Sequence, residues 1–263
     1  MTSLAPEAFL QLRRGRLGDP YEYVAACPST QDLLRDPRLP EGAVAVTEHQ
    51  TSGRGRQGRG WEDSAGRALL CSVLLRPQGG PLPQLSLVAA LAAAEAIEDA
   101  TGRTTSVKWP NDVLVDGCKV AGILLEAVGG GVIAGIGVNV NQQVGELPAR
   151  TRRPAASLRT ATGRTHDRGE LLAGLLLRLE QAYDVWCEQG LEAIRCSLDA
   201  RSFLRGRAVR VDGILGIGGR IAAGGGLEVV LGSGETIVVE SGEVEPDEIG
   251  LRVDVGEERL VDP

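Results

Sequence analysis

Histidine and cysteine, the side chains from which many metal sites are built, are scarce in these 263 residues. The two histidines, His49 and His166, are far apart, which excludes the H-E-x-x-H motif and most histidine-based metal sites. The five cysteines are odd in number, widely spaced and never arranged as C-x-x-C. This pattern favours reduced thiols over a disulfide framework or a zinc site. We therefore expect no dedicated metal site.

A basic overall charge and a long apolar run are also missing. The formal net charge is −7 and aromatic residues make up only 3%, whereas nucleic-acid-binding proteins usually carry a basic face. The longest apolar run, residues 85–97, is interrupted by Ser86 and Glu95 and is too short to cross a bilayer. The N-terminus lacks the pattern of a signal peptide. We expect a cytoplasmic protein without nucleic-acid or membrane partners.

Glycine and arginine, by contrast, concentrate in one stretch, here called the glycine–arginine loop (residues 50–61, QTSGRGRQGRGW). Its four glycines and three arginines precede any apolar side chain, so it can bury no face as a helix or strand. Glycine lets the backbone approach a ligand closely, and arginine offers a fork of donors to phosphate or carboxylate. We therefore predict a mobile anion-binding loop that becomes ordered when its ligand binds.

Two other interpretations of the loop stay open at this point. Gly53, Gly55 and Gly58 spell the dinucleotide fingerprint G-x-G-x-x-G, but residues 61–66 are a poor start for the helix that this fingerprint requires. A merely solvated basic loop is the second alternative. The chemistry of the loop favours ligand binding over both.

Apolar periodicity predicts an α+β fold, a mixed or antiparallel sheet with helices on one face. Asp116-Gly117 lies between two apolar runs, which is a strong hairpin signal. A short helix capped by Ser29 or Thr30 is expected near residue 30, and Asp167 has the spacing of a helix cap. Strands are expected at 21–24, 44–48, 69–75, 113–115, 119–126 and 132–140, and longer helices at 84–100, 168–190 and about 191–201.

The composition changes after residue 205. Short alternating strands separated by glycine-rich turns then predict a small β-barrel. We expect two domains, residues 1–205 and 206–263. The first begins with a polar lead-in, residues 1–20, in which residues 13–16 form a solvated basic run.

Three further segments place polar side chains beside glycine or proline in apolar surroundings. They are KWPND at 108–112, GCKVAGILLE at 117–126 and GIGVNVN at 135–141. Taken alone, Lys119 is as compatible with a surface lysine at a hairpin as with a ligand-binding cation. Asn111 and Asp112 in the first segment likewise have a turn-forming alternative.

Together with the glycine–arginine loop, and in this order, these segments closely resemble the bacterial biotin–protein ligases. The resemblance covers nearly the whole chain from about residue 22. It implies a class II synthetase-like biotin/lipoate ligase catalytic domain followed by a small SH3-like barrel. It also implies two reaction steps, in which biotin and Mg-ATP give biotinyl-5′-AMP and pyrophosphate, and a lysine of the biotin carboxyl carrier protein then takes the biotin. Mg²⁺ is expected to arrive with ATP.

The resemblance also implies roles for individual residues. Arg54, Lys119 and Asp112 are expected to be catalytic, with Asp112 orienting or deprotonating the acceptor lysine. Biotin is expected to contact Ser29, Thr30, Gln31, Gln50, Gly53, Arg54, Gly55, Arg56, Lys119, Gly122 and Gly137. ATP is expected to contact Arg54, Arg56, Arg59, Trp61, Asn111, Lys119 and Asn139.

The sequence departs from the family pattern in two places. Gln31 stands where many relatives have asparagine, so one extra methylene enters the expected ureido pocket. Only about twenty residues precede the catalytic domain, too few for the helix-turn-helix domain of the repressing relatives, and we expect no operator binding. The alternatives are a lipoate–protein ligase and a non-catalytic biotin or nucleotide sensor. The oligomeric state, monomer or homodimer, stays open.

Overall fold

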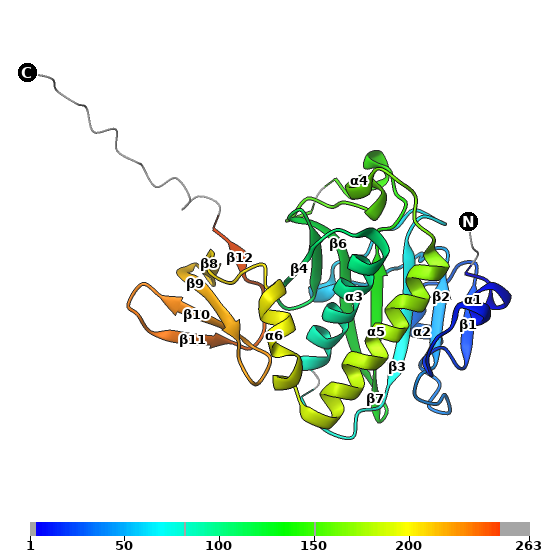
Figure 1. Cartoon of the computed structure of the whole chain (residues 1–263), viewed down its shortest axis with the longest axis horizontal. Coiled ribbons are helices and arrows are strands. Elements are labelled where there is room, and N and C mark those ends of the chain that lie inside the picture. Colours follow the sequence, from blue (N-terminus) through cyan, green and yellow to red (C-terminus); the bar gives the residue numbers. More distant parts are fainter. Residues whose placement is uncertain (1–3, 82, 150, 248–263) are drawn as a thin grey trace, which may run out of the picture.

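The computed structural model of the chain describes residues 4–81, 83–149 and 151–247. At its centre is a seven-stranded mixed sheet in the order β1-β2-β3-β7-β6-β5-β4 (Figure 1). The β1–β2 pair is parallel and the other neighbours are antiparallel, as the sequence predicted. The strands are β1 (Tyr21–Val24), β2 (Val44–Thr47), β3 (Leu69–Leu75), β4 (Thr105–Lys108), β5 (Asp112–Val115), β6 (Cys118–Val128) and β7 (Gly131–Val138).

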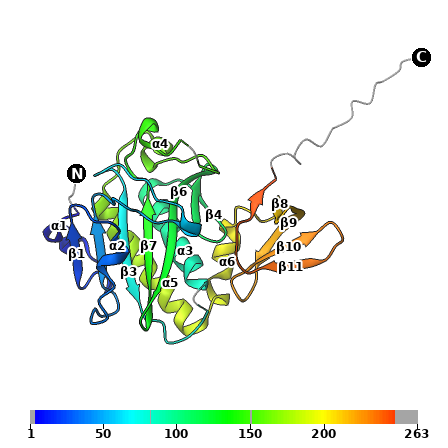
Figure 2. The same ribbon diagram turned by 180° about the vertical axis from the view of Figure 1, so that it is seen from behind.

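The two long helices, α3 (Gln84–Thr101) and α5 (Arg168–Gln189), cover one face of this sheet (Figure 1). The opposite face, seen in Figure 2, carries the short helix α2 (Thr30–Leu33). The prediction that helices cover only one face is therefore wrong. The reason is that Ser29 caps α2 and turns its buried residues onto the sheet. Within the described residues no helix is long and apolar enough to span a membrane.

Side-chain alternation along β7 separates the helix-covered face from the open one. Ile136 and Val138 are buried in the core that includes α3 and α5. Gly135 and Gly137, one residue out of phase, therefore face the other side of the sheet. There they leave room close to the backbone, which becomes the floor of the site described below.

Local sequence signals fixed two of the predicted boundaries. Asp116 and Gly117 have φ angles of 50° and 75°, as a tight hairpin between β5 and β6 requires. The Asp167 carboxylate accepts from the backbone N–H groups of Gly169 and Glu170 and so caps α5. A 3-10 helix, η2 (Val144–Glu146), and a short α-helix, α4 (Leu158–Thr162), lie between β7 and α5 in the chain.

Within the predicted polar lead-in, residues 1–20, the described residues include buried apolar side chains, whereas Arg14 and Arg16 of the basic run are exposed as predicted. Helix α1 (Pro6–Leu12) buries Phe9, whose ring stacks on Tyr21 at 4.2 Å between centroids. Arg16 is held by the carboxylates of Glu180 and Asp184 on α5. The segment thus packs on β1 and α5, because Leu4, Phe9 and Leu17 join the common hydrophobic core.

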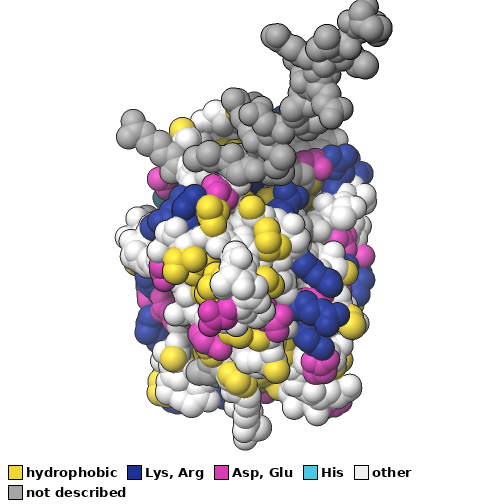
Figure 3. Space-filling view, turned by 90° about the vertical axis from the view of Figure 1, so that its left-hand side faces the viewer, with side chains coloured by type: hydrophobic (Ala, Val, Ile, Leu, Met, Phe, Trp, Pro, Cys, Tyr) yellow, Lys and Arg dark blue, Asp and Glu magenta, His cyan; other side chains and the backbone are white. Residues whose placement is uncertain are grey.

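Helix α6 (Glu192–Arg201) leads into a second, five-stranded antiparallel sheet in the order β11-β10-β9-β8-β12, here called the C-terminal unit (residues 208–247). Figure 3 faces this unit and shows apolar side chains dispersed among charged ones. Its strands are β8 (Ala208–Val211), β9 (Ile214–Ile221), β10 (Leu227–Leu231), β11 (Thr236–Val239) and β12 (Glu245–Pro246). The rest of the predicted 206–263 domain, residues 248–263, lies outside the described residues.

Candidate active site

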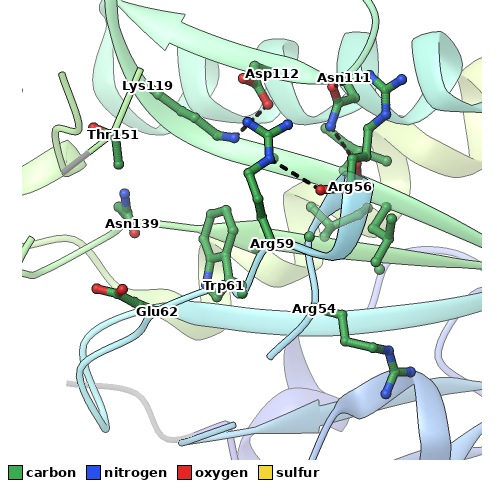
Figure 4. Close-up of a pocket in the computed structure, with 18 of the residues that line it drawn as sticks. Arg54, Arg56, Arg59, Trp61, Glu62, Asn111, Asp112, Lys119, Asn139 and Thr151 are labelled. Atoms are coloured by element: carbon green, nitrogen blue, oxygen red, sulfur yellow. Dashed lines mark hydrogen bonds and ion pairs between the residues drawn. The ribbon is translucent and has the colours of Figure 1, made fainter. Parts of the chain in front are cut away.

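A cavity of about 430 Å³ opens on the sheet face opposite α3 and α5, between the glycine–arginine loop, the sheet and the C-terminal unit (Figure 4). Of the sixteen residues that the resemblance assigns to the site, all but Gly53 line it, and Gly53 lines an adjoining groove. The fifteen are Ser29, Thr30, Gln31, Gln50, Arg54, Gly55, Arg56, Arg59, Trp61, Asn111, Asp112, Lys119, Gly122, Gly137 and Asn139.

One wall of the cavity consists of buried polar side chains around α2. Ser29 and Thr30 are only 2% and 3% exposed. The backbone N–H of Thr30 donates to Gln50 Oε1 at 2.9 Å, and the Thr30 hydroxyl lies 2.7 Å from that of Ser72. Ser29 caps α2 through the Gln31 N–H, so the capping alternative is correct and is compatible with lining the cavity. This wall suits a neutral ligand rich in hydrogen-bonding groups.

The same wall shows how the chain accommodates Gln31. Its Nε2 donates to the backbone oxygen of Leu124 at 3.0 Å and lies 3.5 Å from that of Ile133. A Cβ atom on Gly135 would lie 3.0 Å from this nitrogen. The missing side chain at position 135 therefore provides the room that the longer glutamine amide needs.

This packing predicts coupling between positions 31 and 135. Gly135→Ala is expected to lower the free energy of unfolding by about 1–3 kcal/mol, because the new methyl group displaces the buried amide. Gln31→Asn withdraws the amide, so Gly135→Ala should cost less in that background. Urea unfolding of the four proteins of the double-mutant cycle measures this. Strictly additive effects would show that the Gln31 amide is not what limits position 135.

The glycine–arginine loop folds back on itself through its own backbone. The Trp61 N–H donates to Gly53 O at 2.9 Å, and the Gly55 N–H to Arg59 O at 2.7 Å. A Cβ atom on Gly53 would lie 2.5 Å from Trp61 O, so this position needs glycine for the close pairing of the two loop ends. Gly53 thus shapes the loop rather than lining the main cavity, and ligand-induced ordering of the loop stays a prediction.

Arg54 points away from the other cations of the cavity (Figure 4). Its Nη1 lies 2.9 Å from Asp32 Oδ2, and its Nε lies 2.8 Å from Glu126 Oε1. The hydrogen bonds from Arg54 keep the pKa of Asp32 below its ordinary value, against the opposing effect of burial. A direct contact of Arg54 with a carboxylate or phosphate stays a prediction that requires these ion pairs to open.

The indole of Trp61 lies flat on the floor of the cavity. Cβ atoms on Gly137 and Gly122 would come within 2.6 and 3.0 Å of its ring. The Lys119 ammonium lies 5.8 Å from the centre of the ring, and the indole N–H is buried without a partner among the described residues. The two glycines therefore form a seat for a planar group, which the indole fills here.

The KWPND segment brings two polar contacts into the cavity. Lys119 Nζ lies 2.6 Å from Asp112 Oδ1 (Figure 4). Arg56 donates to Asn111 Oδ1 at 3.1 Å, and Asn111 Nδ2 donates to the backbone oxygen of Ile123 at 2.8 Å. Burial lowers the pKa of Arg56 from its ordinary value, but a guanidinium stays charged at neutral pH.

Asn139 is buried and already bonded within the protein. Its Nδ2 donates to Ala156 O at 3.1 Å, and its Oδ1 accepts from Gln142 Nε2 at 3.0 Å. A primary amide has a second N–H and a second lone pair, so the side chain still has capacity for a base. Contact of Asn139 or Trp61 with adenine stays a prediction.

Several residues of the cavity had no assigned role in the sequence. Lys108 is the first residue of the KWPND segment, and Thr151, Arg152 and Arg153 lie in the loop before α4. The adjacent arginines in a proline-bearing segment were the only sequence signal for that loop. Three acidic residues of the cavity, Glu62, Glu243 and Glu245, also had no assigned role. Glu243 and Glu245 come from the C-terminal unit, so the unit contributes directly to the cavity.

The cavity is electropositive on an acidic protein. Seven cations against four carboxylates line it, whereas the chain as a whole has a net charge of −7. Of the 28 basic residues only two are lysines, Lys108 and Lys119, and both line the cavity. The excess of positive charge suits a ligand with several negative charges. No group of three or more metal-binding side chains occurs among the described residues.

Comparison with known proteins agrees with this geometry. The Biotin/lipoate A/B protein ligase family matches residues 23–143. The biotin--[acetyl-CoA-carboxylase] ligase of Mycobacterium tuberculosis is 35% identical over 215 residues, which cover 78% of this chain and 79% of the relative. The bifunctional ligase/repressor BirA of Bacillus subtilis is 38% identical over 183 residues, and this chain spans 56% of its length.

A solved structure of the biotin protein ligase from Aquifex aeolicus in complex with biotin and ATP superposes with a TM-score of 0.78. The two chains are 32% identical, and the match covers 85% of this chain and 96% of the other. These similarities show that the chain belongs to the biotin/lipoate A/B protein ligase family, among its bacterial biotin–protein ligases.

Proposed function

We propose that this protein is an ATP-dependent biotin–protein ligase. It activates biotin as biotinyl-5′-AMP, releasing pyrophosphate, and transfers biotin to a lysine of the biotin carboxyl carrier protein of a carboxylase. The observation that carries the proposal is the convergence of Lys119, Arg56 and Arg59 on one cavity whose other wall is polar and buried (Figure 4). The relative named for acetyl-CoA carboxylase and the Aquifex complex with biotin and ATP support it.

The first step joins two anions, so positive charge has to offset their repulsion. A biotin carboxylate oxygen attacks the α-phosphorus, and the bond to the pyrophosphate leaving group breaks. Lys119, Arg56 and Arg59 supply charge that stabilises the pentavalent phosphorus and the leaving group. Mg²⁺ enters as part of the Mg-ATP substrate, and we assign Asn111 as the side-chain oxygen next to the phosphates.

The second step is attack by the acceptor lysine on the acyl carbon, with AMP leaving. The attacking amine has to lose a proton, and Asp112 is the carboxylate that the KWPND segment supplies beside Lys119. We therefore assign Asp112 to orienting or deprotonating that lysine. Closure of the glycine–arginine loop would keep water from the mixed anhydride, since hydrolysis competes with transfer.

The finer parts of the assignment rest on the family resemblance. We propose that residues 1–205 and 206–263 are separate domains, and that the C-terminal unit is an SH3-like barrel. A cytoplasmic location and the absence of operator binding stay predictions. A gel-shift experiment with the biotin-operon promoter would contradict the latter if the protein retarded the DNA. Sedimentation equilibrium would distinguish a monomer from a homodimer.

The test is biotin-dependent ATP–pyrophosphate exchange, followed by transfer of labelled biotin to a purified carrier domain. Exchange with biotin but not with lipoate, together with transfer, is the expected result. Exchange that prefers lipoate would make the protein a lipoate ligase. Tight biotin binding without exchange would make it a sensor.

A further inference from the structure

Residues 242–245, which lead into β12 and include its first residue, insert acidic groups among the cations of the cavity. Glu243 forms ion pairs with both Arg59 and Arg152. The backbone oxygen of its neighbour, Gly242, accepts from Arg56 at 3.3 Å. The Glu243 side chain is only 14% exposed, so its charge is largely withdrawn from water.

The two arginines held by Glu243 come from different loops. Arg59 belongs to the glycine–arginine loop, and Arg152 to the loop that precedes α4. Both loops and Glu243 line the main cavity. One carboxylate of the C-terminal unit therefore connects the two cationic loops across the main cavity.

A carboxylate and a phosphate offer similar acceptor oxygens to a guanidinium fork. A triphosphate carries several negative charges where Glu243 carries one, so it competes effectively for the same arginines. Resting on the proposed function, we propose that Glu243 is a positioning residue that stands in for the phosphates of ATP. It keeps Arg59 and Arg152 at the cavity in the absence of nucleotide and releases them to the phosphates when ATP binds.

Glu243→Gln tests this, because glutamine keeps the shape of the side chain and removes its charge. The KM for ATP in biotin-dependent pyrophosphate exchange is expected to fall about three- to tenfold with little change in kcat, since the phosphates no longer displace a carboxylate. Without ATP, trypsin is expected to cleave faster after the arginines of the glycine–arginine loop. Saturating ATP should abolish that difference.

Glu235→Gln is the matched control, because Glu235 is an exposed carboxylate of the same unit whose side chain lies outside the cavity. A rise in KM together with faster cleavage would overturn the proposal, because it would show that the carboxylate supports the nucleotide-bound site. Unchanged KM and unchanged cleavage would overturn it as well. If Glu243→Gln does not fold, Glu243→Asp shortens the side chain and withdraws its carboxylate from both arginines, so it should likewise free the loop to trypsin. The trypsin arm needs no catalysis, so it separates failure of this proposal from failure of the proposed function.

A second inference comes from the scarcity of lysine. A mixed anhydride acylates an amine that has a free lone pair, whereas a guanidinium stays protonated and unreactive at neutral pH. Lys119 Nζ lies 2.6 Å from Asp112, and Lys108 Nζ lies 2.7 Å from Glu245, so each ammonium is held by a carboxylate. We infer that the side chains of this protein are poor acceptors of the acyl group that it activates, which again rests on the proposed function.

Self-labelling measures this directly. The acceptor nitrogen would attack the acyl carbon, AMP would leave, and the amine proton would pass to water. Peptide mass spectrometry after incubation with biotin and ATP, without carrier, is expected to find biotin on neither Lys108 nor Lys119.

Arg207→Lys and Arg38→Lys each place one new lysine on the exposed surface. Both variants are expected to become biotinylated at that lysine, since an exposed lysine has about a hundredfold more free base than an arginine. Biotin on Lys108 or Lys119 of the wild type would overturn the inference, and so would variants that stay unlabelled while carrier transfer proceeds. Absence of carrier transfer would instead refute the proposed function.

Discussion

Lys119→Ala is expected to reduce the rate of biotin-dependent pyrophosphate exchange by about 10²–10³-fold, the usual effect of removing one group that stabilises charge developing in a transition state. Lys119 extends from β6 into the cavity, within ion-pair distance of Asp112 and beside the indole of Trp61. Its charge is placed to act on both the carboxylate and the α-phosphate. Biotin affinity, measured by calorimetry without ATP, should fall much less than the exchange rate.

Two variants distinguish this role from a general loss of charge or fold. Lys119→Arg keeps the charge, but its planar fork is a poor substitute for a compact ammonium, so only partial activity is expected. Arg103→Ala removes an exposed cation that pairs with Asp116 at the nearby hairpin, and it should leave exchange unchanged. An exchange rate of Lys119→Ala close to that of the wild type would remove Lys119 from the chemistry while leaving the rest of the site intact.

Local chemistry explains which features were predictable from the sequence. The hairpin at Asp116 follows from two residues that tolerate positive φ between apolar runs. The cavity residues were found because each motif is contiguous and places its polar groups at strand ends or in tight loops. The order of the motifs does not reveal where each side chain points, and Arg54 is an example. It belongs to the most conspicuous stretch of the chain, yet it pairs with Asp32 and Glu126.

The features that were missed depend on contacts between distant parts of the chain. Glu243 meets Arg59 across 184 residues, and no local pattern distinguishes it from Glu240 and Glu245 in the same acidic stretch. The packing of the lead-in was missed for a similar reason. Arg16 is exposed as predicted, but its carboxylate partners lie on α5, more than 160 residues away. Burial on a helix surface decided the fold of that segment, and composition alone could not reveal it.

Gly137→Ala is expected to expel the Trp61 ring from its seat and to weaken biotin binding by at least about tenfold, since a buried site has little room for an added methyl group. Gly137 has no positive φ, so its backbone admits alanine, and the effect comes from the contact alone. A Cβ atom there would lie 2.6 Å from the indole, too close for two carbon atoms. The displaced indole should give red-shifted fluorescence in the ligand-free protein, and titration with biotin would give the affinity.

Gly145→Ala is the matched control, because a Cβ atom at Gly145 would meet nothing within 4 Å. It should change neither the emission nor the affinity. Trp61→Ala separates the two consequences of Gly137→Ala. Without the indole, the added methyl group has no ring to displace, yet it should still weaken biotin binding if biotin approaches the same stretch of β7. Full recovery of biotin affinity in the double variant would mean that Gly137 serves only as the seat of Trp61, and the ligand would then have to lie elsewhere on the floor.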